Sequence, residues 1–145
     1  MKIKSFKGML ENGAQDRIYL AGGDSNIGYR IVKMSLISKT PGAVAETEGV
    51  IKVFKTKQTS IDAVIDFDVD ELLAAAAYQD HDGSSYVSSI DVIFDDEVVN
   101  QDIYITWSCT DNDIPMNYLI HLEEVKMSGS EQAVVNFEAA LLHNE

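Results

Sequence analysis

Apolar and polar residues alternate with a period of two along most of the chain, which is typical of β-strands that bury one face. Between Ile27 and Leu36 the alternation changes phase once, near Ile31 and Val32, and this predicts a strand with a bulge or bend. The segment 103–109 alternates in the same way and is rich in β-branched and aromatic residues. Further strands are expected near residues 1–7, 50–54, 90–94 and 118–125.

Turn-forming residues separate these predicted strands. They favour turns because they accept positive φ angles or bond their own backbone. The turn signals are Asn12-Gly13, Gly22-Gly23-Asp24, Pro41-Gly42, Asp82-Gly83 and Asp111-Asn112-Asp113. No strand–helix–strand rhythm appears, which disfavours a parallel sheet of the nucleotide-binding kind. The sequence therefore predicts a mainly β fold, an antiparallel β-sandwich resembling a jelly roll.

One internal segment departs from the strand pattern. Residues 70–78 begin with Asp70 and Glu71, where a helix dipole favours acids, and continue with leucines and four alanines. We expect a short helix or a buried connection at this point of the chain.

The C-terminal segment predicts an α-helix over residues 128–143. Ser128 and Glu131 match a capping box, in which each side chain satisfies a backbone amide at the helix start. Within the helix Val134, Phe137 and Leu141 fall on one face. We expect this face to pack on the sheets or on a neighbouring subunit.

The length of 145 residues favours a single domain over residues 1–145. The net charge of −13 repels nucleic-acid phosphates, and no cluster of bases offsets it, so we expect no nucleic-acid partner. No apolar run is long enough to span a membrane. The basic start leads into polar residues, which indicates a first strand instead of a signal peptide. Cys109 is the only cysteine, and we expect a small buried residue.

Several acidic clusters are candidate Ca²⁺ ligands. Asp80 and Asp82 lie in one predicted turn and Asp111 and Asp113 in another, and loop acids can share a cation if the fold brings them together. Their ordinary role in turns, bonding the local backbone, is the preferred interpretation. We expect no bound metal or other cofactor.

A third acidic cluster recurs at every other residue, at Asp66, Asp68 and Asp70. On a strand these carboxylates share one face, with Phe67 and Val69 turned inward. The spacing fails as a Ca²⁺ loop because it lacks the turn glycine and the bidentate glutamate. A solvent-facing strand edge is therefore the preferred interpretation.

No catalytic residues are identified. The three histidines, His81, His121 and His143, share no ligand spacing, and no nucleophile elbow is present. A site assembled in space from a histidine or Cys109 beside a carboxylate stays an alternative. A sugar-binding face is another alternative, and its candidate residues are Tyr78, Tyr86, Tyr104, Trp107 and Tyr118.

Several segments, in this order, resemble a family of small virion proteins encoded by tailed bacteriophages of marine bacteria. They are residues 27–33, 41–42, 52–56, 59–62, 100–106 and 117–123 and the C-terminal helix. The resemblance runs from about Asp24 to the end of the chain. It carries no chemical motif. It implies a non-enzymatic component of the phage particle, made in the host bacterial cytoplasm.

A capsid decoration or cement protein is the first expectation from this resemblance, and a tail or neck component is the second. A carbohydrate- or calcium-binding adhesion module is the rival class. The expected partners are other virion proteins and further copies of the chain, as a homo-oligomer or an array. The candidate contact residues are Phe6, Met9 and Leu10 in the first strand and Val134, Phe137 and Leu141 in the C-terminal helix.

Overall fold

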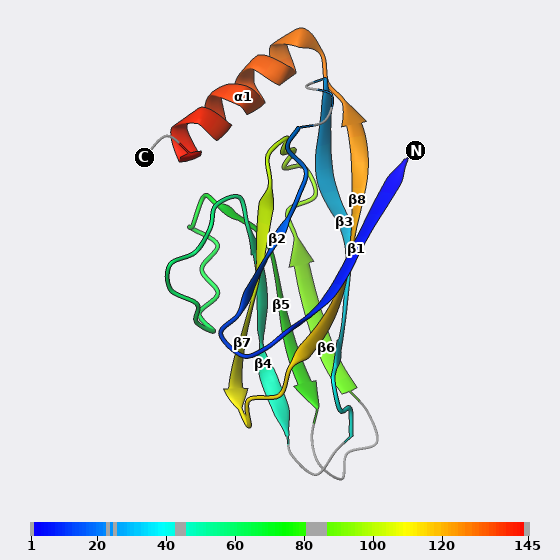
Figure 1. Cartoon of the computed structure of the whole chain (residues 1–145), viewed down its shortest axis with the longest axis vertical. Coiled ribbons are helices and arrows are strands. Elements are labelled where there is room, and N and C mark those ends of the chain that lie inside the picture. Colours follow the sequence, from blue (N-terminus) through cyan, green and yellow to red (C-terminus); the bar gives the residue numbers. More distant parts are fainter. Residues whose placement is uncertain (1, 23, 25, 43–45, 81–86, 144–145) are drawn as a thin grey trace.

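The protein consists of two antiparallel sheets and one C-terminal helix (Figure 1). The computed structural model describes residues 2–22, 24, 26–42, 46–80 and 87–143. The elements are β1 (Ile3–Leu10), β2 (Gln15–Ile18), β3 (Ile27–Ser38), β4 (Thr47–Phe54), β5 (Leu72–Asp80), β6 (Val87–Ile93), β7 (Ile103–Asp111), β8 (Met116–Lys126) and α1 (Gly129–His143). The prediction of a mainly β, antiparallel fold is thus confirmed.

The smaller sheet has three strands in the order β1-β8-β3. Strand β8 lies at its centre and pairs with β1 from Leu10↔Met116 to Ile3↔Glu123. In β3 the register shifts between Ile31 and Lys33, which confirms the predicted bulge. The bulge keeps Ile31 and Met34 on the buried face, at 3% and 6% exposure, although a strict alternation would separate them.

The larger sheet has five strands in the order β2-β7-β4-β5-β6. Its fourth strand corrects the prediction of an internal helix, because residues 72–80 form β5. This strand pairs with β4 on one side and β6 on the other. Alanine prefers helices by only a few tenths of a kcal/mol over most residues, so two ladders of hydrogen bonds and burial outweigh that preference.

One hydrophobic core joins the two sheets. Trp107 of β7 is fully buried, and its indole nitrogen donates to the Ile114 carbonyl at 2.9 Å. Gly49 of β4 leaves the space that the indole fills, since an added Cβ would lie 2.6 Å from a Trp107 ring carbon. From the other sheet, Tyr118 reaches across and donates to Asp16 Oδ2 at 2.8 Å. Burial raises the pKa of the Tyr118 phenol, and the Asp16 carboxylate raises it further.

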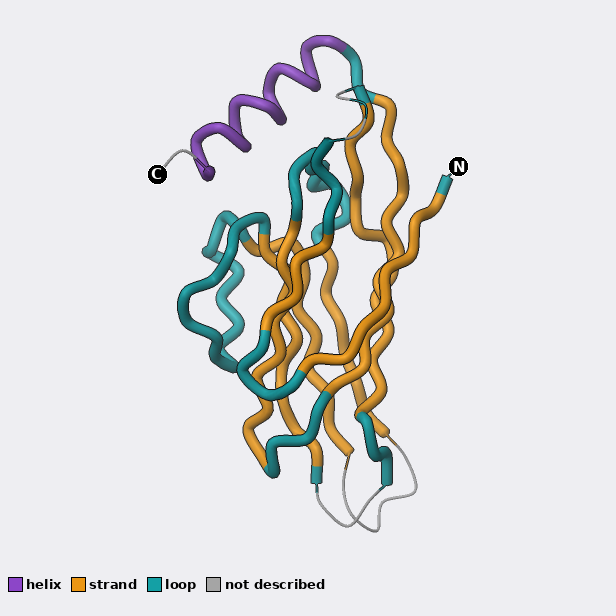
Figure 2. The backbone as a smooth tube through the Cα atoms, viewed as in Figure 1, coloured by secondary structure: helices purple, strands orange, loops and turns teal. Residues whose placement is uncertain are grey.

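The residues of the predicted acidic strand face lie outside the strands. Asp66, Asp68 and Asp70 belong to a segment of turns between β4 and β5, so the prediction of a strand there is wrong. Phe67 and Val69 are 55% and 37% exposed instead of turned inward. The tube in Figure 2 shows this connection as a wide loop beside the five-stranded sheet.

Helix α1 confirms the predicted C-terminal helix, and Ser128 caps it by accepting a hydrogen bond from the Glu131 amide at 3.3 Å. The helix lies at one end of the molecule, beyond the strands (Figure 1). Its face toward the protein bears Val135, Ala139 and Leu142, which line a small cavity beside the segment 98–103. Of the two expectations for the Phe137 face, packing on the sheets is therefore wrong, and packing on a neighbouring subunit stays a prediction.

Candidate functional site

Several surfaces of the protein expose apolar side chains, the edge strand β6 with Ile90 at 70% among them, and the first is helix α1. Val134, Phe137 and Leu141 are 57%, 65% and 59% exposed. They recur at spacings of three and four residues and so form one continuous stripe. On the opposite face of the helix Val135, Ala139 and Leu142 are half-buried beside the segment 98–103, and Asn136 accepts a hydrogen bond from the Asn100 side-chain amide. The stripe is therefore an anchored apolar surface that nothing in the chain covers among the described residues.

The N-terminal contact candidates separate in the structure. Met9 is 42% exposed on the outer face of the three-stranded sheet, the face that points away from the core. Phe6 is half-buried and packs against the core. Leu10 is 1% exposed and belongs to the core itself, which removes it from the candidate surface. Sequence alternation could have separated Met9 from Leu10, because neighbouring strand residues point to opposite faces.

The second surface is this outer face of the three-stranded sheet. Met9, Ile37 and Leu119 lie in one region of it and line an open groove of about 680 Å³. Ile37 is 53% exposed, and Leu119 is half-buried. Lys7 borders the groove. Lys33 lies on the same face, two residues before the groove residue Ser35 in β3. Among the described residues neither lysine has a carboxylate partner, so the face is apolar with positive charge beside it.

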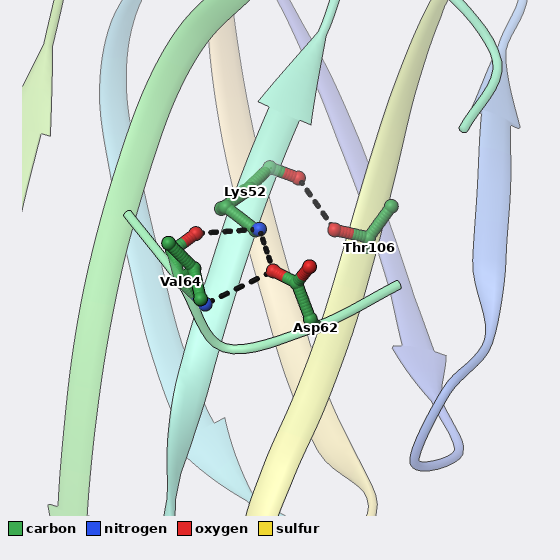
Figure 3. A network of polar contacts seen from close by, with 4 residues as sticks. All are labelled: Lys52, Asp62, Val64 and Thr106. Carbon is green, nitrogen blue, oxygen red and sulfur yellow. Dashed lines mark hydrogen bonds and ion pairs between the residues drawn. The ribbon is translucent and has the colours of Figure 1, made fainter. Parts of the chain in front are cut away.

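The third surface is the loop between β4 and β5, residues 55–71, which is closed at its base by a hydrogen bond from the Lys55 amide to the Glu71 carbonyl at 2.8 Å. A network seen in Figure 3 holds it against the outer face of the five-stranded sheet. Lys52 Nζ donates to Asp62 Oδ1 at 2.9 Å and to the Val64 carbonyl at 2.7 Å. Only 9% of the Lys52 side chain is exposed, so the loop buries this cation.

The contacts of this network also lower the pKa of its carboxylate, Asp62. The hydrogen bond from Lys52 lowers the pKa of Asp62, and the Val64 amide, which donates to Asp62 Oδ1 at 3.0 Å, lowers it further. Behind the lysine, the Thr106 hydroxyl donates to the Lys52 carbonyl at 3.5 Å (Figure 3). The network is satisfied within the chain, and we interpret it as the anchor of the loop.

Beyond this anchor the loop exposes a run in which apolar residues and aspartates alternate. Ile65 and Phe67 are 40% and 55% exposed, and the intervening Asp66 and the following Asp68 are exposed as well. The Phe67 ring rests edge-on against Phe94, with centroids 5.1 Å apart. Apolar groups held in water in a fixed position are typical of a surface that binds another molecule.

The described members of the proposed calcium-binding set do not form a metal site. Asp80, the last residue of β5, is 3% exposed and accepts from the amide of Gly42, 38 residues away, at 2.9 Å, so its carboxylate bonds a distant turn and the preferred interpretation, a bond to its local backbone, is wrong for this residue. Asp113 accepts from the Asn12 amide at 2.6 Å. Asp82 lies outside the described residues. Within the described ranges no three acids, histidines or cysteines come close enough to share a metal ion. Asp111 therefore belongs to no such group there.

The residues of the catalytic alternative also lie apart. His121 Nδ1 is 3.2 Å from the Ser5 hydroxyl on the exposed sheet face. The Cys109 thiol is buried and lies 2.7 Å from the Asp111 carbonyl oxygen, as expected for a small core residue. His81 lies outside the described residues. The described residues place no carboxylate beside either the imidazole of His121 or the thiol.

The aromatic residues of the sugar-binding alternative serve mainly the core. Trp107, Tyr78 and Tyr118 are 0%, 1% and 6% exposed, and Tyr104 is half-buried. Tyr86 lies outside the described residues. A face on which sugar rings could stack needs exposed rings, and these four described residues do not form one.

Sequence reasoning missed one buried ionic site. Asp102, ahead of β7, is 6% exposed and accepts from the Leu20 and Ala21 amides at 2.7 and 2.8 Å. Arg17 donates to its other oxygen at 2.7 Å. Burial alone would raise the pKa of Asp102, but the Ala21, Arg17 and Leu20 hydrogen bonds outweigh it and lower this pKa. The sequence carries no signal for it because the partners lie more than eighty residues apart.

Comparisons with protein-family models, with curated proteins and with solved structures give no match. Within the described residues no helix combines the length and apolar character that a membrane span requires. The arguments below therefore rest on the surfaces of this chain.

Proposed function

We propose that this protein is a non-enzymatic structural component of a bacteriophage particle, and that it decorates or cements the capsid. The observation that carries the proposal is the exposed stripe of Val134, Phe137 and Leu141 on a helix whose other face is half-buried against the protein. A soluble monomer rarely leaves such a stripe in water, because covering each large side chain stabilises a complex by about 1.5–3 kcal/mol. The stripe is suited to a contact with other virion proteins.

The fold and charge support the same role. Two antiparallel sheets around one core form the β-sandwich we propose here, and jelly-roll sandwiches are common building units of capsids. The net charge of −13 gives copies displayed on a particle a mutual repulsion that keeps particles apart in solution. The resemblance to phage virion proteins supplies the setting, with a tail or neck position as the second form of the same role.

The test is incorporation into particles of the phage whose genome encodes the chain. Quantitative mass spectrometry of purified particles measures the copies of this protein per major capsid protein. A ratio near one supports decoration, a few copies per particle supports a tail or neck position, and absence from the particle overturns the proposal.

A matched pair of variants tests the helix stripe. Phe137→Ala removes a side chain that is 65% exposed, and Tyr19→Ala removes one that is 71% exposed at the end of β2. We expect both to fold as the wild type does and only Phe137→Ala to lose incorporation, by about tenfold or more for the loss of one large apolar contact. Full incorporation of a folded Phe137→Ala protein would rule out the helix contact.

A further inference from the structure

The charges of this protein are distributed unevenly between the three-stranded sheet and the rest of the chain. Strands β1, β3 and β8 carry five of the eleven bases and only two of the twenty-four acids. The three-stranded sheet is thus locally basic. The rest of the chain is therefore more acidic than the net charge of −13 indicates. The bases of these strands are Lys4, Lys7, Arg30, Lys33 and Lys126, and the acids are Glu123 and Glu124.

Two of these bases contribute unpaired positive charge to the outer face of the three-stranded sheet. Arg30 is neutralised by Glu123, with a nitrogen–oxygen distance of 2.6 Å. Lys7 and Lys33 are exposed and have no ion pair among the described residues. Beside them the groove is lined by Met9, Ile37 and Leu119. The face therefore offers apolar area together with two cations that lack partners.

The opposite charge lies on the opposite side of the molecule. Lys52 alternates with the core residues Ile51 and Val53, so it points away from the core, and the loop that covers it lies on the outer face of the five-stranded sheet. In this loop the segment 65–70 alternates apolar residues with aspartates, and all six side chains are exposed. Figure 1 shows the loop at the left edge of the molecule and β1, β3 and β8 at the right.

We propose that the segment 65–70 of one copy docks on the outer face of the three-stranded sheet of a second copy. The three carboxylates of the segment match Lys7 and Lys33, and its apolar residues match the groove lined by Met9 and Ile37. The anchor through Lys52 holds the segment in place, which reduces the entropy lost on binding. The contact is heterologous, because its two halves lie on opposite faces of each copy.

A heterologous contact joins copies head to tail and produces either a closed ring or an open filament. The inference deepens the proposed structural role by naming the partner, and it rests on that role only for its biological setting. The contact itself is measured on purified protein without particles. Failure of the contact and failure of the virion role are therefore separate results.

Ionic strength decides whether the local charges or the net charge controls association. At about 0.1 M salt the Debye length is about 10 Å, so adjacent patches attract while the net charges of two whole molecules are largely screened. At about 1 M salt the Debye length falls to about 3 Å and the attraction between patches weakens. Sedimentation velocity over a concentration series at about 0.1 M salt should show association, with a dissociation constant at least tenfold weaker at about 1 M.

Charge reversal of each half gives the decisive experiment. The face variant Lys7→Glu/Lys33→Glu and the loop variant Asp66→Lys/Asp68→Lys are each expected to sediment as monomers, because each presents two surfaces of like charge. An equimolar mixture is expected to associate again, since the acidic loop of the face variant meets the basic face of the loop variant. Circular dichroism and thermal unfolding check that both variants are folded.

The control is Asp95→Lys/Asp96→Lys, which changes the net charge by the same amount at two exposed neighbouring acids outside the loop. It is expected to associate as the wild type does. Four results would overturn the proposal: a wild-type monomer at every concentration, unchanged association of either reversed variant, no recovery on mixing, or a control that behaves as the loop variant does. An oligomer lost only in Phe137→Ala would place the contact on the helix instead.

Discussion

Lys33 in β3 and Lys52 in β4 occupy equivalent positions on the two sheets, since each follows a β-branched residue and points away from the core. Lys52 is buried under the loop and donates to Asp62 and the Val64 carbonyl. Lys33 is exposed and has no ion pair among the described residues. The same residue in the same local pattern is thus a structural anchor on one sheet and an unsatisfied surface charge on the other.

The difference extends to the sheets as wholes. In β4 every residue except Glu48 is buried, because the core covers one face and the loop covers the other. In β8, by contrast, the buried positions alternate with half-exposed ones from Met116 to Glu123. The five-stranded sheet is therefore covered on both faces near its centre, and the three-stranded sheet keeps one face for contacts. We expect substitutions in the larger sheet to cost more stability than their counterparts in the smaller one.

The largest expected effect tests this contrast with two glycines. A Cβ on Gly49 of β4 would lie 2.4 Å from the Ser108 carbonyl oxygen and 2.6 Å from a Trp107 ring carbon. The Ser108 backbone cannot move aside easily, so Gly49→Ala should lower the free energy of unfolding by about 3 kcal/mol. A Cβ on Gly8 of β1 would lie 2.8 Å from the Tyr118 hydroxyl oxygen, so it would meet a buried side chain that is bonded to Asp16, and no backbone atom.

Gly8→Ala should therefore cost less than Gly49→Ala, about 2 kcal/mol, because the Tyr118 ring must shift while the strand gains from replacing glycine. Urea unfolding of the two variants measures both values. Equal costs would show that the smaller sheet is packed as rigidly as the larger one.

The next prediction compares the cost of neutralising two carboxylates, the buried Asp102 and the partly exposed Glu123. Asp102→Asn should cost about 2 kcal/mol at pH 7, because the charged acceptor of the Arg17 and backbone hydrogen bonds is lost. Glu123→Gln in the smaller sheet, whose partner Arg30 is 34% exposed, should cost less than about 1 kcal/mol. The two costs come from the same urea unfolding measurements.

The pH dependence separates the charge from the packing of Asp102. Its pKa is lowered in the folded protein, so its ionised form stabilises the fold above the unfolded pKa of about 3.9, and this contribution is lost as the pH falls through the folded pKa. The stability difference between wild type and Asp102→Asn should therefore be full at pH 7 and shrink below about pH 4. A difference that is constant down to pH 2 would assign the loss to packing.

Periodicity predicted most of the strands because burial of one face imposes it. Strands β3, β7 and β8 and the bulge near Ile31 follow from alternation alone. The alternation failed at residues 66–70, where the same pattern stands in an exposed loop. A period of two reports which residues differ in polarity, and it does not report whether a neighbouring strand is available to pair.

Two other errors have one physical cause, which is that the covering partner is distant in the sequence. Residues 72–80 have the composition of a helix and become a strand because β4 and β6 flank them. Both the face of α1 that bears Phe137 and the face that bears Val135 are apolar. Only the face with Val135 lies beside the segment 98–103, and the face with Phe137 is left exposed. Contacts between distant segments therefore decide which apolar residues stay exposed. The sequence alone predicts the residue types of the candidate surfaces but not which of these residues are exposed.

The smallest expected effect returns to the two lysines. Lys52→Met keeps the buried aliphatic stem and removes the ammonium group, so the Asp62 carboxylate, which is 57% exposed, turns to water. The expected loss of stability is about 1 kcal/mol, because a half-exposed pair is screened by solvent. Lys33→Met, measured in dilute solution where copies do not meet, should change stability by less than about 0.5 kcal/mol.

Stability alone leaves the anchor role of Lys52 open, and two further measurements test it. Without Lys52 the pKa of Asp62 should rise toward its ordinary value, measured by carboxyl NMR titration, because the largest cause of its lowering is gone. Amide hydrogen exchange in residues 56–70 should become faster in Lys52→Met and stay unchanged in Lys33→Met. Unchanged exchange in both would show that the Gln15–Gln58 contacts and the loop closure at Lys55 hold the loop without the buried lysine.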